Sequence, residues 1–296
     1  MKNKRLRKKA TPYGFLAPTL ILMMVFLVVP IFNVIRFSFY DKAFVKKSPA
    51  FIGWQNYETV LGDDIFWTAA KNTLFFVFLS IIAHIILALI FAHLLNSSYF
   101  KTKTRTVARV FYVLPWIFTA TVIAVMWKLM FQPQGIVNYL LSFVGLAAKH
   151  TEWFSNREIA LMVVTFINMW SGYPFYMISV LAGLQGISPD LYESAAIDGA
   201  TSLKSFRHIT LPQLKPILIS LVMLDFVWTL QSFAIVWTLT SGGPLHATEM
   251  LSLYIYKIAF MQSDYSLAAA AAVLLLIVCV IASVFYTRQQ FKIQEG

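Results

Sequence analysis

The stretch of sequence that decides the fold covers residues 188–216 and reads SPDLYESAAIDGATSLKSFRHITLPQLKP. It is a polar island between long apolar segments, and it carries acids, bases and two places where a helix can begin. In a membrane protein, a loop of nearly 30 residues with acids, bases and two helix starts is expected to contact something in water. We therefore interpret residues 188–216 as a loop that contacts water or a partner protein.

The composition of the rest of the chain places it in a membrane. Hydrophobic residues make up 59% of the 296 residues and charged residues only 12%, with a mean hydropathy of +0.70. A soluble domain carries about 25% charged residues. The net charge of +11 does not indicate nucleic-acid binding, because the basic residues collect at the ends of apolar segments, as membrane orientation requires.

A membrane-spanning helix needs about 20 mostly apolar residues. Six segments meet this requirement: residues 15–39, 72–95, 107–131, 158–182, 214–238 and 266–287. The sequence therefore predicts an all-α integral membrane protein with six transmembrane helices in one domain, residues 1–296. The basic run MKNKRLRKK precedes a first apolar segment that is too long for a cleaved signal peptide, so we expect an uncleaved anchor.

The distribution of Lys and Arg predicts the orientation. Bases concentrate before the first span, between the second and third, in the polar island, and after the sixth. With six spans these four segments share one side, which is cytoplasmic by the positive-inside rule. Both termini and the polar island are expected in the cytoplasm.

Sequence motifs for catalysis and metal binding are absent. The chain has no GxxxxGK[ST], HExxH or GxSxG motif, and its five histidines are scattered at spacings unlike those of metal ligands. We predict no catalytic residue, no metal site and no cofactor bound by this chain. The histidines are interpreted as packing contacts or helix ends.

Residues at the start of the polar island predict a short helix and a hinge. Ser188 followed by Pro189 is a good helix start, since a hydroxyl residue caps and proline suits the first helical position. Gly199 then allows a turn. The alternative is an amphipathic connector on lipid headgroups, but the acids of this helix would be repelled by an anionic leaflet.

The second half of the island predicts another short helix. Thr201 or Ser202 can cap a helix over Leu203–His208. Pro212 and Pro216 are then expected to begin the next membrane span.

The residues ESAAIDGA at 193–200, followed by Phe206, Ile209, Leu211 and Pro212, resemble the EAA loop of permease subunits in binding-protein-dependent ATP-binding-cassette (ABC) importers. The one departure is Ser194, where the motif most often has alanine. Five further segments resemble the carbohydrate-importer branch of the maltose-permease type: APTLILMMVFLVVP, FIGWQNY at 51–57, AGLQGISPDLYE at 182–193, LTSGGP at 239–244 and YIYKIAF at 254–260.

This resemblance implies the partners and the residues that couple to them. It implies a second permease subunit, giving a heterodimer, two ATP-binding-cassette subunits that hold ATP and Mg²⁺, and an extracytoplasmic sugar-binding protein, all at a bacterial or archaeal cell membrane. The island would sit in a cleft of the ATPase subunit, with Glu193 and Gly199 at its centre. The implied coupling residues are Tyr192, Glu193, Ser194, Ala195, Asp198, Gly199 and Ala200.

Two polar stripes predict the substrate path. Asn168, Gly172 and Phe175 share one face of the fourth span, and Asp225, Thr229 and Ser232 repeat this spacing in the fifth. Polar groups inside a membrane usually face a protein interior or a wet cavity. In the resembled permeases the matching positions, and that of Trp116, surround the sugar, although most side chains differ. The predicted substrate residues also include two neighbours, Tyr176 and Gln231.

Other interpretations of these residues stay open. Asn168 and Thr229 could serve only as interhelical hydrogen-bond partners, and Asp225 could pair with a partner subunit. A stand-alone secondary transporter is the main alternative to an importer permease, although the chain shows no internal repeat. A membrane enzyme is disfavoured by the missing motifs. Oligosaccharide is the first choice of substrate, glycerol-phosphate-type solutes and amino sugars are alternatives, and Asp225 favours a neutral or cationic sugar.

Overall fold

The computed structural model describes residues 15–43, 45–97, 101–145 and 150–295, and all the named elements in these ranges are helices. The chain divides into two compact units. One comprises Met1–Asp63 with Ile255–Val278, and the other comprises Asp64–Tyr254 with Cys279–Gly296. The prediction of one integral membrane domain stays a prediction.

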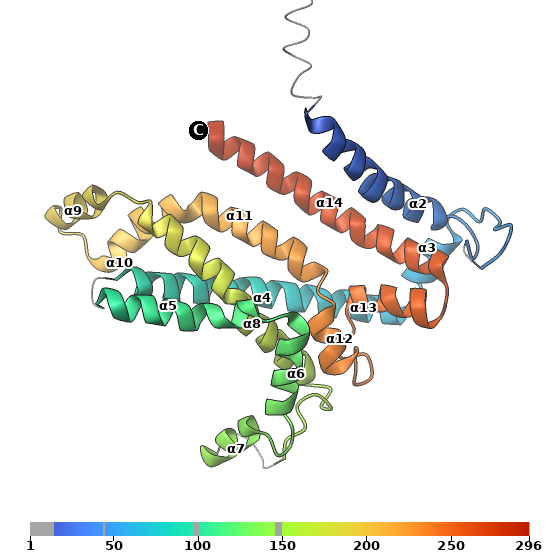
Figure 1. Cartoon of the computed structure of the whole chain (residues 1–296), viewed down its shortest axis with the longest axis horizontal. Helices are drawn as coiled ribbons and strands as arrows, with labels where there is room; N and C mark the ends of the chain where they lie inside the picture. Colours follow the sequence, from blue (N-terminus) through green and yellow to red (C-terminus); the bar gives the residue numbers. More distant parts are fainter. Residues whose placement is uncertain (1–14, 44, 98–100, 146–149, 296) are drawn as a thin grey trace, which may run out of the picture. The chain divides into compact units, whose positions relative to one another are not determined.

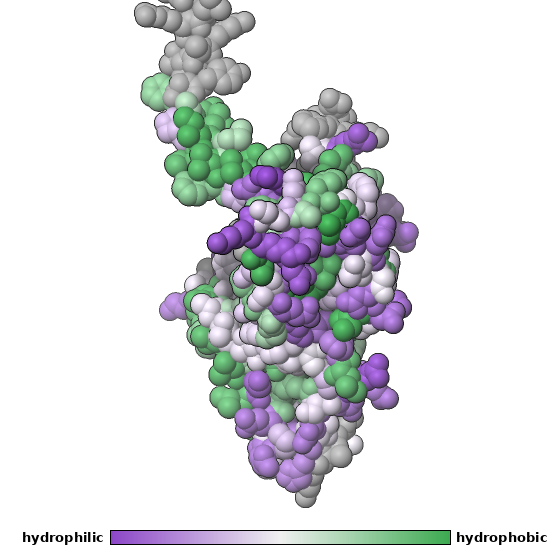
Figure 2. Space-filling model, turned by 90° about the vertical axis from the view of Figure 1, so that its right-hand side faces the viewer, coloured by the Kyte–Doolittle hydropathy of each residue, from purple (hydrophilic) through white to green (hydrophobic). Residues whose placement is uncertain are grey.

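The first unit contains an apolar helix, Phe15–Phe37, which is long enough to cross a membrane. Its large side chains are exposed along its length, and Figure 2 shows this surface in green. Exposure of such a large apolar surface to water is unfavourable, so the surface needs lipid or a partner helix around it. The other helical segments of this unit include α3 (Gln55–Leu61), η3 (Lys257–Met261) and the first part of α14 (Tyr265–Glu295). The helix Phe15–Phe37 itself contains η1 (Met24–Val28) and α2 (Val29–Phe37).

The second unit is a helical bundle with a polar loop at one end. In Figure 1, α4, α5, α8 and α11 run alongside one another, with α9 and α10 at the left-hand end. The bounds of its helices are as follows: α4 (Asp64–Asn96), α5 (Thr102–Ile117), α6 (Ala120–Met130), α7 (Ile136–Phe143), α8 (Ala160–Gln185), α9 (Pro189–Ile197), α10 (Ser202–Ser205), η2 (Phe206–Thr210), α11 (Leu211–Leu230), α12 (Ala234–Thr240) and α13 (Leu251–Tyr256).

The centre of this bundle is the packing of α4 against α8. Ala88 and Ala92 of α4 are fully buried and pack in a cluster with Met177 and Val180 of α8. Helices in lipid associate through close packing of small residues, because lipid tails supply no hydrophobic driving force between them. The pair α4–α8 is therefore the rigid support for the neighbouring helices.

The predicted third span, 107–131, is not one straight helix. It breaks after α5, where Phe118 and Thr119 are extended, and α6 leaves at an angle of 98° to the preceding helix. The Thr119 hydroxyl caps the new helix by accepting a hydrogen bond from the Val122 N–H at 3.4 Å. The capping signal at Thr119 outweighs the continuous apolar pattern, which alone predicted an unbroken span.

The predicted fifth span, 214–238, is also interrupted, and the helix that carries it begins before residue 214. The apolar helix begins at Ser202, inside the polar island, and continues to Leu230, where α11 ends. Residues 231–233 then break the chain before α12. Pro212 lies in the first turn of α11, where its missing N–H is tolerated. It therefore does not separate the island from the span.

Five helices in the described residues are long and apolar enough to span a membrane, and the bent pair α5–α6 raises the number to six. The predicted six-span, all-α architecture is therefore confirmed. The predicted cytoplasmic position of both termini stays a prediction.

Candidate functional site

A cavity lies where the two interrupted spans break. It has a volume of about 430 Å³ and is lined from both breaks and from α8. Broken helices at membrane depth occur where backbone groups face a cavity or protein interior, and they often form solute sites in transporters. The lining residues are Trp116, Phe118, Ala120, Ile123, Asn168, Ser171, Gly172, Trp228, Ser232, Phe233, Ala234 and Ile235.

Two tryptophans of the cavity lining are connected through a third aromatic ring. Phe175 lies between Trp116, at a ring-centroid distance of 5.7 Å, and Trp228, at 5.4 Å. The side chains of Trp116 and Trp228 are about half exposed. Flat aromatic faces beside small polar groups can hold the ring faces and hydroxyls of a sugar. None of the described lining residues carries a charge.

A buried ionic cluster lies directly behind the cavity wall. His84 Nδ1 of α4 is 2.7 Å from Asp225 Oδ2 of α11, and the Thr229 hydroxyl donates to Asp225 Oδ1 at 2.7 Å. His84 and Asp225 are only 2% and 1% exposed. The Tyr176 ring stacks on the His84 ring at 4.7 Å. This cluster joins α4, α8 and α11 by groups that would be costly to leave unpaired in hydrocarbon.

The helix α4 also holds the polar residues of the wall on α8, although it contributes no lining residue itself. Asn168 Nδ2 donates to the hydroxyl of buried Ser80 at 3.0 Å. A Cβ on Gly172 would lie 2.5 Å from His84 Nε2, so glycine is needed for the close approach of the two helices. Ser80 and His84 lie one turn apart on α4 and thus support two adjacent positions of the cavity wall.

The structure separates the predicted substrate residues into three groups. Four line the cavity: Trp116, Asn168, Gly172 and Ser232. Phe175 lies behind Trp116 and Trp228, and Gln231 is exposed at the break and is not among the lining residues. Contact with a substrate stays a prediction for all nine residues.

The predicted place of Asp225, Thr229 and Tyr176 on the cavity wall is corrected. All three are buried, and they form the ionic cluster with His84. Helical spacing shows that residues lie on one face of a helix, but it does not show which neighbouring helix packs against part of that face. Asp225 and Ser232 lie two turns apart, and α4 covers the first of them.

Sequence reasoning missed His84, Ser80, Ser171, Trp228 and Phe233. His84 and Asp225 are each an ionisable residue deep in a long apolar helix. Two such residues in different spans pair with one another when the spans are neighbours. The two ionisable residues are visible in the sequence, but the sequence does not show that α4 and α11 are neighbours.

The polar island has the hinge that the sequence predicted. Gly199 has a φ of +74°, in the region that favours glycine, and the Ala200 N–H donates to the Ala195 carbonyl across the turn at 2.8 Å. Ser188 precedes α9 as predicted, but its side chain makes no capping hydrogen bond. The Thr201 hydroxyl does cap α10, accepting from the Lys204 N–H at 3.4 Å.

The loop is tied to the long helix that enters the membrane region. The Tyr192 hydroxyl lies 2.9 Å from the Thr210 hydroxyl, linking α9 to η2. The helix continues from η2 into α11, which carries Asp225 and reaches the cavity at Trp228. A displacement of the loop therefore has a continuous helical path to the cavity wall.

Two apolar side chains stand out from this loop and were also missed. Ile197 is 87% exposed and Leu203 is 76% exposed, one on each side of the Gly199 turn. The predicted coupling residues Glu193, Ser194 and Asp198 are exposed beside them. The loop thus presents both charged and apolar side chains at its surface.

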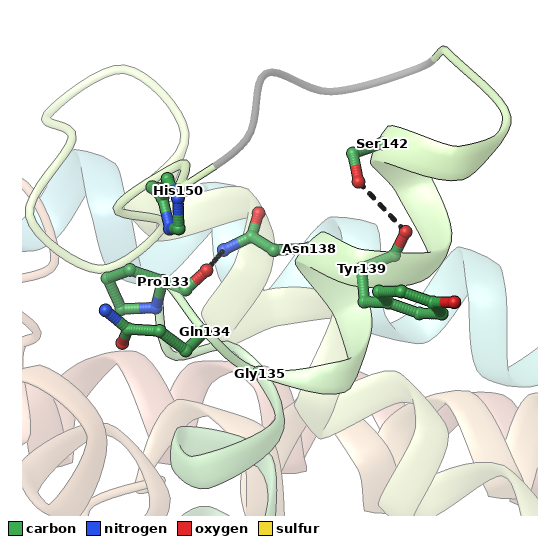
Figure 3. A pocket seen from close by; sticks show the side chains of 7 residues that line it. All are labelled: Pro133, Gln134, Gly135, Asn138, Tyr139, Ser142 and His150. Carbon is green, nitrogen blue, oxygen red and sulfur yellow. Dashed lines mark hydrogen bonds between the residues drawn. The ribbon is translucent and has the colours of Figure 1, made fainter.

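A second, smaller hollow of about 190 Å³ lies beside α7 (Figure 3). Asn138 anchors it: its amide donates to the carbonyls of Pro133 and Thr151, and its Oδ1 accepts from Trp153 Nε1. These bonds satisfy the buried amide within the loop itself. The hollow therefore has a structural explanation and is separate from the cavity at the two breaks.

Broken spans around a mainly apolar cavity with a few polar groups, together with a protruding loop, indicate a subunit that moves solutes through a membrane. Among the described residues no group of three or more His, Cys, Asp or Glu side chains could hold a metal ion. A protein-family comparison supports the same class. The binding-protein-dependent transport system inner membrane component family matches residues 84–295.

The chain belongs to the family of binding-protein-dependent transport system inner membrane components, which are transport permeases. It is 32% identical to the trehalose/maltose transport system permease protein MalF of Thermococcus litoralis, over 95% of this chain and 94% of that protein. It is also 32% identical to the lactose transport system permease protein LacF of Rhizobium radiobacter, over 94% of each. These relatives confirm the predicted membership of the carbohydrate-importer branch.

A solved structure agrees with this assignment. A chain of a bacterial ABC transporter involved in the import of the acidic polysaccharide alginate superposes with a TM-score of 0.84, at 26% identity and 99% coverage of both chains. The protein is therefore a multi-pass membrane permease subunit of an ABC importer. The predicted identity as a transporter subunit rather than an enzyme agrees with this family.

Proposed function

We propose that this chain forms one half of the translocation path of an ATP-driven importer for uncharged oligosaccharides. The observation that carries the proposal is the cavity at the two helix breaks, whose described lining has aromatic, amide and hydroxyl groups and no charge. Sugars bind to such surfaces through ring stacking and hydroxyl hydrogen bonds. Relatives that transport trehalose, maltose or lactose support the substrate class.

The proposed sugar contacts follow from the wall of this cavity. Trp116 and Trp228 offer flat faces, and Asn168, Ser171 and Ser232 offer hydrogen-bonding groups. A lining that holds both flat rings and hydrogen-bonding groups suits a sugar ring, which has apolar faces and a hydroxyl edge. Asn168 is held in place by Ser80, so its amide is oriented before the sugar arrives.

The proposed energy source is ATP hydrolysis by two partner ATP-binding-cassette subunits, which would hold ATP and Mg²⁺. The polar island would dock into one of these cassettes through Tyr192, Glu193, Ser194, Ala195, Asp198, Gly199 and Ala200, together with the exposed side chains of Ile197 and Leu203. A second permease, different from this one, would complete the cavity. An extracytoplasmic sugar-binding protein would deliver the sugar at a bacterial or archaeal cell membrane.

The charge of the cavity favours an uncharged substrate over a glycerol-phosphate-type solute. A phosphate or carboxylate needs positive groups or several aimed N–H donors. The described lining residues include no Lys, Arg or His. This difference also separates the proposal from the alginate importer, whose substrate is acidic.

Uptake by the assembled importer in proteoliposomes tests the proposal. Labelled maltose, trehalose and lactose are compared with galacturonate oligomers and glycerol 3-phosphate, each with its binding protein, with and without ATP inside. We expect ATP-dependent uptake of at least one neutral sugar. Uptake driven by an ion gradient without ATP would support a secondary transporter instead, and ATP-dependent uptake of only the anionic solutes would overturn the substrate class.

A further inference from the structure

An acidic residue, Asp225, is buried behind a cavity whose described lining residues carry no charge. Asp225 belongs to α11, one turn before the lining residue Trp228, and its partner His84 touches the lining residue Gly172. An unpaired carboxylate at this depth would give the cavity a negative potential, because a membrane protein interior screens charge weakly. The state of His84 therefore decides the charge of the cavity.

The hydrogen bonds of His84 define how many protons the cluster holds. His84 Nε2 faces the Asn168 carbonyl at 3.4 Å, and because a carbonyl can only accept, this contact favours the form of His84 in which Nε2 carries a proton. His84 Nδ1 and Asp225 Oδ2 then share one further proton across 2.7 Å. With two protons on the imidazole–carboxylate pair, its net charge is zero, whichever of the two atoms the shared proton lies nearer to.

The other groups around this pair do not change its charge. Thr229 donates a neutral hydroxyl to Asp225 Oδ1, and Tyr176 stacks on the imidazole and is the third titratable group of the cluster. The pair is thus closed by α4, α8 and α11. Removing one member of a buried pair leaves the other uncompensated, whereas replacing both by neutral groups restores balance.

We propose that His84 determines the charge specificity of this permease: it neutralises Asp225 behind the wall and so keeps the cavity selective for uncharged solutes. His84 does not line the cavity itself. It therefore acts through Asp225, as a positioning and neutralising residue. This role of His84 in substrate selection rests on the proposed function in sugar transport. Its test needs no transported substrate.

The test measures the charge of the cavity with a cysteine reporter. Cys279→Ser removes the one native cysteine, and Ser171→Cys places a thiol on the lining. The assembled importer in nanodiscs is treated with a cationic trimethylammonium-ethyl and an anionic sulfonatoethyl methanethiosulfonate. The ratio of the two labelling rates reports the local potential, and the same ratio at exposed Thr59→Cys corrects for the reagents themselves.

We expect a corrected ratio near one in the native background. His84→Asn should raise the cation-to-anion ratio by about tenfold or more, the effect of one uncompensated charge on the order of 10 Å away at an effective dielectric of about 20. The double variant His84→Asn/Asp225→Asn should return the ratio to the native value. Asp225→Asn alone should leave the ratio unchanged or lower it.

Two results would overturn the inference. The first is an unchanged ratio in His84→Asn at both neutral and alkaline pH, which would show that the imidazole does not neutralise the cavity. The second is an increase that persists in the double variant, which would place the charge elsewhere. If His84→Asn does not assemble, an increased ratio in Asp225→Asn contradicts the inference by itself. Failure of sugar uptake alone would refute the proposed function and leave these ratios as they are.

Discussion

The close approach of α4 and α8 at Gly172 gives a quantitative prediction. In Gly172→Ala the new methyl group would lie 2.5 Å from His84 Nε2 and 2.8 Å from Cε1. Ordinary contact begins near 3.4 Å, so the ring must retreat by roughly 0.9 Å. Because the same ring holds a 2.7 Å hydrogen bond to Asp225, a shift of this size would change the geometry of that bond and strain the buried pair.

The cost of this change combines two effects. Overpacking a core costs about 1–3 kcal/mol, and strain in the buried pair adds a part of the roughly 3–5 kcal/mol that complete removal of one partner would cost. We expect Gly172→Ala to reduce the free energy of unfolding by about 3 kcal/mol and to lower sugar uptake. The assay is denaturant unfolding of the purified permease, followed by circular dichroism, and uptake by the assembled importer.

Gly183→Ala is a matched control on the same helix. Its methyl group would also lie 2.5 Å from a neighbour, but that neighbour is the terminal Cδ1 of Ile217, which can rotate away. We expect a loss of no more than about 1 kcal/mol, typical of a tolerated overpacking. An equal loss in the two variants would refute the reasoning, because it would show that the His84–Asp225 bond does not oppose the movement of the ring.

Three further predictions concern the loop and the cluster. Gly199→Ala meets no atom within 4 Å but keeps a φ of +74°, so it should cost about 1–2 kcal/mol of backbone strain and reduce sugar-stimulated ATPase activity, whereas Gly199→Asn should reduce it less. The double variant Ile197→Ser/Leu203→Ser should leave the fold unchanged by circular dichroism and reduce co-purification of the ATPase subunit by about tenfold, the effect of losing a small hot spot. Thr229→Val should lower the free energy of unfolding by about 1.5–3 kcal/mol by removing one hydrogen bond to a buried carboxylate, which thermal unfolding can detect.

Hydropathy and capping residues predicted much of this fold. Long apolar segments located the spans, and Gly199 and Thr201 located the turn and the second helix start in the polar island. The breaks were missed because a span that bends at Phe118–Thr119 keeps the same apolar composition as a straight one. Continuity from the loop into α11 was missed because Pro212 can begin a helix or lie in the first turn of one that continues.

The candidate site was predicted only in part, for a different reason. Helical spacing brought Asn168 and Gly172 to the cavity, but it could not show that α4 covers Asp225. The neighbour of a helix face is a property of tertiary packing, and a single sequence carries little information about it. The sequence therefore could not show that Asp225 is buried against His84.

The most direct test of the central claim, that the polar island couples ATP hydrolysis to sugar movement, is a comparison of Glu193→Lys with Glu193→Gln. Glu193 is exposed on α9, so neither change disturbs the core. ATP hydrolysis and maltose uptake are measured together in proteoliposomes that contain the assembled importer. We predict that Glu193→Lys abolishes uptake and its coupling to hydrolysis while the permease stays folded, and that Glu193→Gln retains part of both. Native uptake and hydrolysis in Glu193→Lys would contradict the claim.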